Sequence, residues 1–357
     1  MSFSISPHAL DVHGSNLINL AELLPDADGY ATTHVSLTLI DTSFLYARVI
    51  GYADAARDAV IAMHADLGEA LTLSGNELKA IAARSRELDD AIEAELDSAY
   101  PDQLITCLDE TTDAIGNGPY QAPVSPRNSL STPVDQAPFD LVTMILKTEW
   151  FSPSYWISEL IGYVFSWNPV TEVTQVFSGD WAALYTADSA LTKLGDFHAK
   201  QGENITFAMA LSANTWEGEA AEAANIFFTN MARLSDLTAE ELRTLGPEFK
   251  IVAMSMESAA GVVSGLINQV LDLLIVAAVI YAAGAATSAT GVGAIVGALG
   301  GSAALVRAVM LAEEAWSAIS KVVLVIDSLG AVIGVFESFA VNGATFPKPV
   351  PYDNPEV

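Results

Sequence analysis

Apolar and small residues recur at mixed spacings of three and four on both sides of residues 214–218. The members are Leu184, Ala187, Leu191, Leu194, Ile205 and Ala208 before this point, and Ala220, Ala224, Phe227, Met231 and Leu234 after it. Such spacing places side chains on one face of an α-helix. Acidic residues between 217 and 222 suit the start of the second helix, where negative charge favours the macrodipole. The pattern predicts a long helical hairpin, from Pro169 to about Leu245.

The first hundred residues show the same helical spacing. A short helix is expected over His8–Leu24 and an Ala-rich helix over Leu45–Leu71. Ser74-Gly75-Asn76-Glu77 fits a capping box, so a further helix is expected to begin there. The run 33–40 alternates apolar and polar residues like a short strand, although we favour a helix or an extended linker. Residues 1–100 are therefore predicted to be an N-terminal helical domain.

Composition divides the rest of the chain into three parts. Residues 101–140 are predicted to be a linker, because the stretch 117–138 holds five of the fifteen prolines and such segments are extended rather than packed. Residues 141–345 carry the hairpin and a second, more apolar hairpin. An aromatic-rich block at 150–167 could be a membrane-interface belt or a partner groove, although a helix capping the hairpin core is favoured. Residues 346–357 are predicted to be a flexible tail.

The most apolar stretch is Leu273–Val306, which contains 34 residues and no formal charge. Gly293, Gly297 and Gly301 are spaced by four, which lets two helices approach closely. We predict that the chain reverses at 288–291 and that the two arms form a buried core hairpin. The following helix, expected over 303–339, has only a narrow polar stripe and is predicted to bury most of its sides. The stripe consists of Arg307, Glu314, Lys321 and Ser328.

Asp272 and Arg307 are the only formal charges between Glu257 and Glu313. A reversal centred at position 289.5 places both at the same height on antiparallel arms. They are therefore candidates for a buried ion pair, although each could instead extend separately to solvent. In a buried pair, loss of one partner would leave an uncompensated charge.

Charge and composition exclude several classes of function. The net charge of −29 argues against binding to nucleic acid, whose phosphates require basic patches, and it disfavours contact with anionic lipids. Hydrophobic residues make up 51% of the 357 residues, enough for a large all-α core. Cys107 is the only cysteine, so no intrachain disulfide is expected. The first fourteen residues lack the charged and apolar regions of a cleavable signal peptide, so secretion would need another route.

The sequence offers no constellation for catalysis. None of the five histidines belongs to an HExxH or Cys/His zinc pattern, and there is no GxSxG, Walker loop or GxGxxG unit. His198 lies on the apolar face of the predicted hairpin, where a satisfied core or interface residue is expected. We predict a non-enzymatic protein without catalytic residues, cofactor or metal.

Trp216 and Gly218 form a Trp-x-Gly triplet at the point where two amphipathic helices meet. Here the chain resembles the WXG superfamily of type VII secretion substrates, which are helical hairpins with this triplet in the turn. Residues 150–340 also look like the trafficking region at the front of actinobacterial polymorphic toxins. The resembling stretches are Phe151–Trp156, Ser178–Trp181, Asn214–Ala224 and Thr287–Gly297.

The resemblance implies export and helix–helix pairing, and it supplies no catalytic residue. Expected partners are a small helical WXG-type protein or a second copy, the type VII secretion machinery, and a separate toxin chain. The family places a Tyr-x-x-x-Asp/Glu export signal beyond its hairpin, and Tyr352 with Glu356 matches it, as does Tyr155 with Glu159. The expected localisation is secreted or at the cell surface.

Two other functions stay open. One is a secreted effector that inserts into membranes or forms pores through residues 262–340. Each uncharged arm has about 15 residues, roughly 22 Å of helix against a hydrocarbon core of about 30 Å, which favours the buried hairpin. The other is a cytosolic scaffold unrelated to export.

Overall fold

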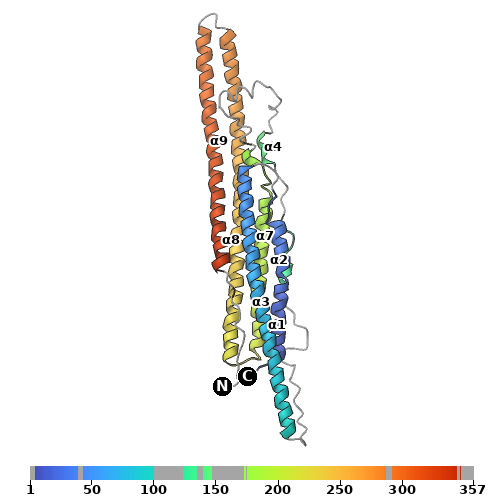
Figure 1. The fold of residues 1–357 in the computed structure, drawn as a ribbon. Helices are drawn as coiled ribbons and strands as arrows, with labels where there is room; N and C mark the ends of the chain where they lie inside the picture. The colour runs from blue at the N-terminus through green and yellow to red at the C-terminus, as the bar shows by residue number, and fades with distance from the viewer. Residues whose placement is uncertain are drawn as a thin grey trace.

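The computed structural model describes residues 5–38, 43–99, 124–134, 140–146, 173, 175–286, 292–343 and 346. These residues form helices and connections and contain no strand, which confirms the all-α class. The long helices lie side by side as a narrow rod (Figure 1).

Two short helices open the chain. Helix α1 spans Pro7–Glu22, and the Ser6 hydroxyl accepts a hydrogen bond from the Ala9 amide at its start. Helix α2 spans Leu24–His34, with a proline near its first turn. The first expected helix is thus confirmed. The alternating run at 33–37 is not a strand, because its first residues end α2 and the next form an irregular connection.

Helix α3 spans Phe44–Ala99 without interruption. The predicted helix start at Ser74 is therefore wrong. The Ser74 hydroxyl donates to the Ala70 carbonyl, one turn back in the same helix, instead of capping a new one. Gly75 lies where α1 crosses α3, and a Cβ atom there would be 2.6 Å from the Gly14 carbonyl oxygen. The Ser74-Gly75 pair, which resembles a helix start in the sequence, therefore lies at a close contact between α1 and α3.

The predicted hairpin is formed by α7 (Ala183–Ala213) and α8 (Glu219–Ala286), which pack along each other. Pro169 lies outside the described residues. The hairpin was expected to end at about Leu245, but α8 continues past that residue and through Pro247. A Cβ at Gly246 would be 2.8 Å from the Asp188 carbonyl oxygen of α7. Tertiary packing at this contact maintains the helix although proline removes one backbone hydrogen bond.

Helix α9 spans Val292–Ser338 and returns along α8, so the second, apolar hairpin also forms. It ends in the π-helical turn η4 (Phe339–Gly343). An ion pair between Arg48 and Asp327 connects α3 with α9. Figure 1 shows that α8 and α9 extend together past the ends of α3 and α7.

Short segments line the sides of the rod. The 3-10 helix η1 (Pro126–Ser129) lies against α7, and α4 (Leu141–Leu146) lies against α8. Lys193 donates hydrogen bonds to the Ser131 hydroxyl and the Thr132 carbonyl. The prediction of an unpacked linker is therefore wrong for residues 124–134.

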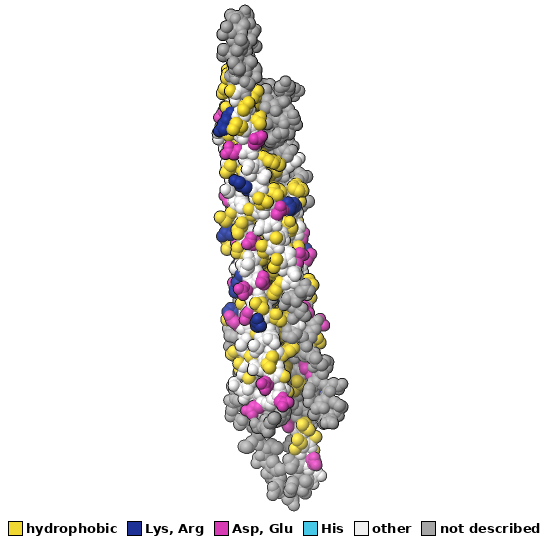
Figure 2. Space-filling view, turned by 90° about the vertical axis from the view of Figure 1, so that its left-hand side faces the viewer, with side chains coloured by type: hydrophobic (Ala, Val, Ile, Leu, Met, Phe, Trp, Pro, Cys, Tyr) yellow, Lys and Arg dark blue, Asp and Glu magenta, His cyan; other side chains and the backbone are white. Residues whose placement is uncertain are grey.

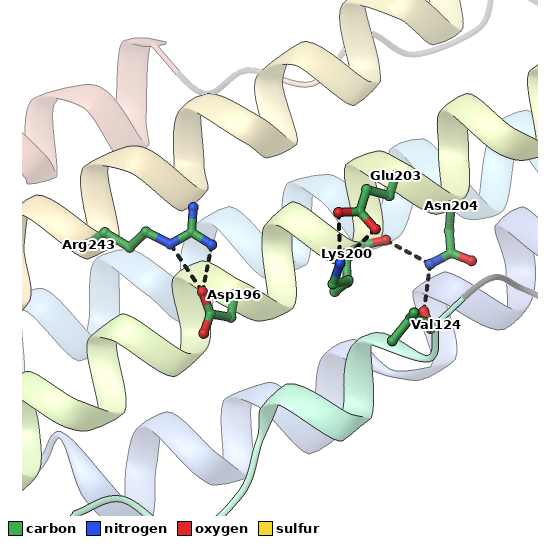
Figure 3. A network of polar contacts seen from close by, with 6 residues as sticks. All are labelled: Val124, Asp196, Lys200, Glu203, Asn204 and Arg243. Atoms are coloured by element: carbon green, nitrogen blue, oxygen red, sulfur yellow. Dashed lines mark hydrogen bonds and ion pairs between the residues drawn. The ribbon is translucent and has the colours of Figure 1, made fainter.

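Figure 3 shows how α7 is held on both sides. The Asn204 side-chain amide donates to the carbonyls of Val124 and Lys200. On the other side, Arg243 of α8 pairs with Asp196 at 2.5 Å. These contacts hold η1 and α8 in position around α7.

Candidate interaction surfaces and a buried histidine pair

The Trp-x-Gly triplet lies in the connection between α7 and α8. The Trp216 side chain is buried, with 7% of its surface exposed. Gly218 has φ +120°, a conformation that disfavours every residue with a Cβ atom, and its carbonyl accepts from the Glu222 amide in the first turn of α8. The glycine therefore allows the chain to enter α8 directly after the tryptophan.

A cavity of about 330 Å³ lies beside this turn. Trp216, Met209 and Phe228 contribute apolar walls, and Glu217 and Glu222 contribute the acidic part of its lining. The cavity is formed by the end of α7 and the start of α8.

His13 of α1 packs next to the same turn. Its ring lies 4.7 Å from the Phe228 ring, and its Nδ1 is 3.0 Å from the Ser212 hydroxyl. That hydroxyl donates to the Met209 carbonyl, so Nδ1–H of His13 donates to Ser212 and Nε2 carries the lone pair. Nε2 has no partner among the described residues. Burial lowers the pKa of His13 to about 4, so the ring is neutral at pH 7.

A second histidine site connects three helices. Nδ1 of His64 on α3 is 2.5 Å from Oδ1 of Asp28 on α2, and its Nε2 is 2.9 Å from Nε2 of His198 on α7. Both imidazoles are buried. If His64 donates through Nδ1–H to the carboxylate, its neutral Nε2 accepts, and His198 must donate through Nε2–H. The Nδ1 of His198 then carries a lone pair, and it has no partner among the described residues.

The environment of His198 keeps it neutral. Burial is the main cause that lowers the pKa of His198 well below the usual value, and the electrostatic effect of the neighbouring His64 imidazole lowers it further. The expectation of a core histidine is thus confirmed for burial, but not for satisfied hydrogen bonding. Sequence analysis missed His64, which is 134 residues away from its partner along the chain. Its position between Val60, Met63 and Leu67 on the buried face of α3 was the available signal.

The histidine pair has the geometry of a structural connection. Both rings lie inside the helix interfaces and contact Phe197, with His64 6.3 Å and His198 5.6 Å from that ring. Among the described residues, no group of three or more His, Cys, Asp or Glu side chains could hold a metal ion. The pair therefore fixes α2, α3 and α7 to one another.

Apolar side chains are exposed mainly on one half of the rod. Of the twenty large apolar side chains exposed among the described residues, eleven lie on α9 or on α8 after Lys250. They are Ile251, Met254, Val262, Val276 and Val279 of α8, and Val306, Val309, Met310, Trp316, Leu324 and Val335 of α9. Figure 2, which views the molecule from the α9 side, shows hydrophobic side chains between scattered charged ones along the rod.

The prediction that the 303–339 helix buries most of its sides is wrong. Among the described helices, α8 and α3 cover one side of α9, and the opposite side faces solvent. Leu324 is 68% exposed and Val335 is 67% exposed. The predicted polar stripe lies on the same exposed side. The sequence shows how few polar residues the helix has, but not that other helices leave one side uncovered.

Asp272 and Arg307 are both exposed, and no ion pair of the described residues joins them. The prediction of a buried pair is therefore wrong in its burial. Gly293, Gly297 and Gly301 lie within α9 on the arm that packs along α8, and their role in close helix contact stays a prediction. Tyr352, Glu356, Tyr155 and Glu159 lie outside the described residues, as does the 151–156 stretch.

Two helical stretches are long and apolar enough to cross a membrane by length and composition, Glu219–Ala277 and Ala303–Val341. In the most apolar window of each, 44% and 33% of the residues are buried, so more than half of each window lies outside the core. No family model matches the chain, and neither a curated protein nor a solved structure matches it.

Proposed function

We propose that this chain is a non-enzymatic, secreted protein that acts by pairing its α9 helix with a helix of another polypeptide. The observation that carries the proposal is the solvent-exposed outer face of α9 between Trp316 and Val335. Its large apolar side chains Trp316, Leu324 and Val335 are 54%, 68% and 67% exposed, and exposed apolar side chains on one face favour protein association. We call this region the α9 face, made of the exposed residues Trp316, Ser317, Ser320, Lys321, Leu324, Asp327, Ser328, Ala331, Gly334 and Val335.

The composition of the α9 face suits a second helix. Ser317, Leu324 and Ala331 repeat every seven residues, the period of helices that pair along their length. Small residues between the larger ones allow close approach, and a Cβ added at Gly334 would meet nothing within 4 Å. Two formal charges lie on this face: Asp327 is already paired with Arg48 of α3, and Lys321 is the charge that a second helix would have to accommodate.

The proposal of export rests on the α7–α8 hairpin. Its connection carries Trp216 and Gly218, the triplet on which the WXG resemblance rests; the tryptophan is buried and the glycine has positive φ, as in any helix turn closed by a buried Trp and a flexible Gly. We propose a type VII route, with a small WXG-type protein or a second copy of this chain as the helical partner. A toxin carried on a separate chain fits the same proposal, because the contact requires only a helix.

Association can be tested with variants that differ only in where the charge is placed. Leu324→Glu and Val335→Glu alter the α9 face, and Ile226→Glu is the control, since Ile226 is also exposed, at 59%, but lies near the start of α8. Light scattering across a concentration series should show self-association that the first two variants weaken and the control retains. A photo-crosslinking residue at position 324 should capture a small helical protein in the native host if the partner is another chain. A monomer at every concentration that forms no crosslink at 324 contradicts the proposal.

Export requires a separate measurement. The secreted fraction of wild type and Trp216→Phe is compared in an actinobacterial host with and without an active type VII system. We expect secretion that depends on that system. Equal amounts in the medium of both hosts would contradict the export route while leaving the pairing proposal untouched.

A further inference from the structure

Exposed residues repeat every seven positions along a stretch of α9 that is longer than the α9 face. We call them the α9 stripe, and its members are Ala303, Met310, Ser317, Leu324 and Ala331, all of them exposed. A repeat of seven keeps side chains in line along a helix that pairs with another helix. The stripe extends over about 42 Å of helix at 1.5 Å per residue. It is therefore long enough to pair with a second helix over many turns.

Four charged side chains flank the stripe on the same exposed side of α9. They are Arg307, Glu313, Glu314 and Lys321. Among the described residues, none of the four forms an ion pair within the chain. A fifth, Asp327, pairs with Arg48 of α3, but its side chain is 46% exposed and its carboxylate can accept from a second cation. The order of these charges along α9 therefore decides which second helix fits.

The charges are arranged about Ser317 with opposite signs on its two sides. Glu313 lies four residues before Ser317, and Lys321 lies four residues after it. Arg307 and Asp327 lie ten residues before and ten residues after it. In an antiparallel pair of two α9 helices centred at Ser317, each residue lies at the level of the residue equally far on the other side. Both of these levels then join an acid to a base.

The uncharged members of the stripe follow the same arrangement. Met310 and Leu324 are seven residues before and after Ser317, and they are 53% and 68% exposed. The centred pair brings these two apolar side chains to one level and removes both from water. Ala303 and Ala331, fourteen residues from the centre, meet in the same way, and two small side chains there allow close approach. Apolar and charged levels thus agree on one centre.

Other arrangements of two α9 helices bring like charges together. In a parallel pair in register, Glu313 would meet its own copy, and so would Lys321. Shifting the antiparallel pair by seven residues brings Glu313 to the level of Glu314 in one direction and Glu314 to the level of Asp327 in the other. In the centred pair Glu314 lies at the level of the neutral Ser320 instead. A parallel pair that is staggered cannot close into a symmetric dimer, so charge and symmetry select one direction and one register.

The charge of the whole chain does not prevent this contact. Between positions 303 and 331 there are two basic and three acidic residues, although the whole chain has 15 basic and 44 acidic ones. Figure 2 shows side chains of both signs along this side of the rod. Exposed charges more than about 8 Å apart are largely screened at physiological salt. Two copies of an acidic rod can therefore approach each other along the stripe.

We infer that the partner of α9 is a second copy of this chain, which binds antiparallel about a two-fold axis at Ser317. The inference rests on the proposed pairing function and names the partner of the same helix. Because a two-fold contact is self-complementary, the pairs Glu313–Lys321 and Arg307–Asp327 each occur twice. The contact is narrow and has a serine at its centre, so the dimer should dissociate on dilution.

Direction and register can be tested with single cysteines in the full chain carrying Cys107→Ser. Ser317→Cys should form a covalent dimer on mild oxidation, because its two copies meet at the axis. Leu324→Cys should not, because its two copies lie about 21 Å apart along the pair and a disulfide needs Cα atoms within about 7 Å. Mixing the Met310→Cys and Leu324→Cys proteins should link the two different chains.

An exchange of charges tests which residues meet, with the dimer dissociation constant measured by sedimentation equilibrium. Lys321→Glu and Glu313→Lys should each weaken the dimer about tenfold, since attraction becomes repulsion at two symmetric contacts. The double variant should return to within about threefold of wild type. The matched control combines Lys321→Glu with Glu240→Lys, an exposed position on α8, which restores the net charge and should not restore the dimer. Circular dichroism checks that all variants are folded.

The outcomes separate this inference from the proposed pairing function. Equal crosslinking by Leu324→Cys and Ser317→Cys would contradict the antiparallel register. A double variant as weak as its single parents would show that residues 313 and 321 do not meet. A monomeric wild type whose photo-crosslinker at position 324 captures another protein would overturn the second copy as partner and leave the pairing function intact. A monomer that captures nothing would contradict both.

Discussion

The two halves of the rod use opposite means to hold helices together. The half built from α1, α2, α3, α7 and the start of α8 has buried histidines, asparagines and a glutamine, and seven of the eight ion pairs of the described residues. The half built from the rest of α8 and α9 has almost exclusively apolar and small contacts. Polar groups in a core accept few alternative positions, whereas apolar helices can slide or exchange partners at low cost. The first half is thus built for one arrangement, whereas the second half keeps large apolar side chains exposed.

The cost of this specificity is visible at individual atoms. Five buried side-chain nitrogen and oxygen atoms have no partner among the described residues, and all five lie in α1 or α7. His13 and His198 each contribute one of them, an unpaired ring nitrogen. An unpaired buried polar atom costs about 1–3 kcal/mol. These positions therefore make the first half sensitive to conditions that do not affect the second half.

The largest expected difference between the halves concerns two tryptophans. Trp216→Ala removes a ring that is 7% exposed and should lower the free energy of unfolding by about 3–5 kcal/mol. Trp316→Ala removes a ring that is 54% exposed and should change it by no more than about 0.5 kcal/mol. Urea unfolding followed by circular dichroism measures both. Equal losses for the two variants would show that the exposed half is covered in solution.

Acid should weaken the first half selectively. The folded pKa of His13 is lowered to about 4, below the usual value of 6.5, so below pH 6.5 the unfolded chain binds more protons than the folded one. Stability from this group is fully present above pH 6.5 and is lost as the pH falls toward 4, by about 1.4 kcal/mol per pH unit. The lowered pKa of His198 acts in the same direction. Urea unfolding at pH 7, 6 and 5 should show this loss, reduced in His13→Gln. An unchanged slope in that variant would assign the acid sensitivity to other groups.

Two glycine substitutions should have opposite signs. At Gly75 an added Cβ would lie 2.6 Å from the Gly14 carbonyl oxygen, so Gly75→Ala should destabilise by about 1–3 kcal/mol. At Gly261 it would meet nothing within 4 Å, so Gly261→Ala should stabilise α8 by up to about 1 kcal/mol through helix propensity. Thermal melts of the two variants test this prediction. A destabilising Gly261→Ala would reveal a close contact on the exposed side of α8.

The smallest effect is expected for Asp272 and Arg307. Both side chains are exposed and no ion pair of the described residues joins them. The changes in the free energy of unfolding caused by Asp272→Asn and by Arg307→Met should therefore be additive within about 0.5 kcal/mol. A double-mutant cycle by urea unfolding measures the coupling. A coupling above about 1 kcal/mol would require the two groups to meet in solution.

Local periodicity was sufficient to predict much of the fold. The helical class, the hairpin around Trp216 and the reversal between α8 and α9 all follow from residue spacing and from the uncharged stretch. Helix ends were harder, because Ser74 and Pro247 are signals for an end that neighbouring helices override. A hydroxyl can bond within its own helix, and packing can compensate for the bond that proline removes.

The contacts of the sites were less predictable than the fold. His64 and His198 meet only because α3 and α7 pack in one register, which no local pattern encodes. The exposure of Leu324 and Val335 depends on how many helices surround α9, and the sequence of α9 does not contain that number. The position of Trp216 in a turn was predictable, since the two helical patterns end on either side of it.

Helix α8 has a consequence for how the rod transmits force. Its 68 residues form a single strut of about 100 Å that takes part in both halves. A pull or a rotation applied at one end is carried through one backbone, so the two halves are mechanically coupled in series. Pro247 lacks the amide hydrogen that would bond the Arg243 carbonyl, which makes this position the most compliant joint of the strut. Bending there would tilt the α8–α9 end against the histidine-linked bundle without unfolding either.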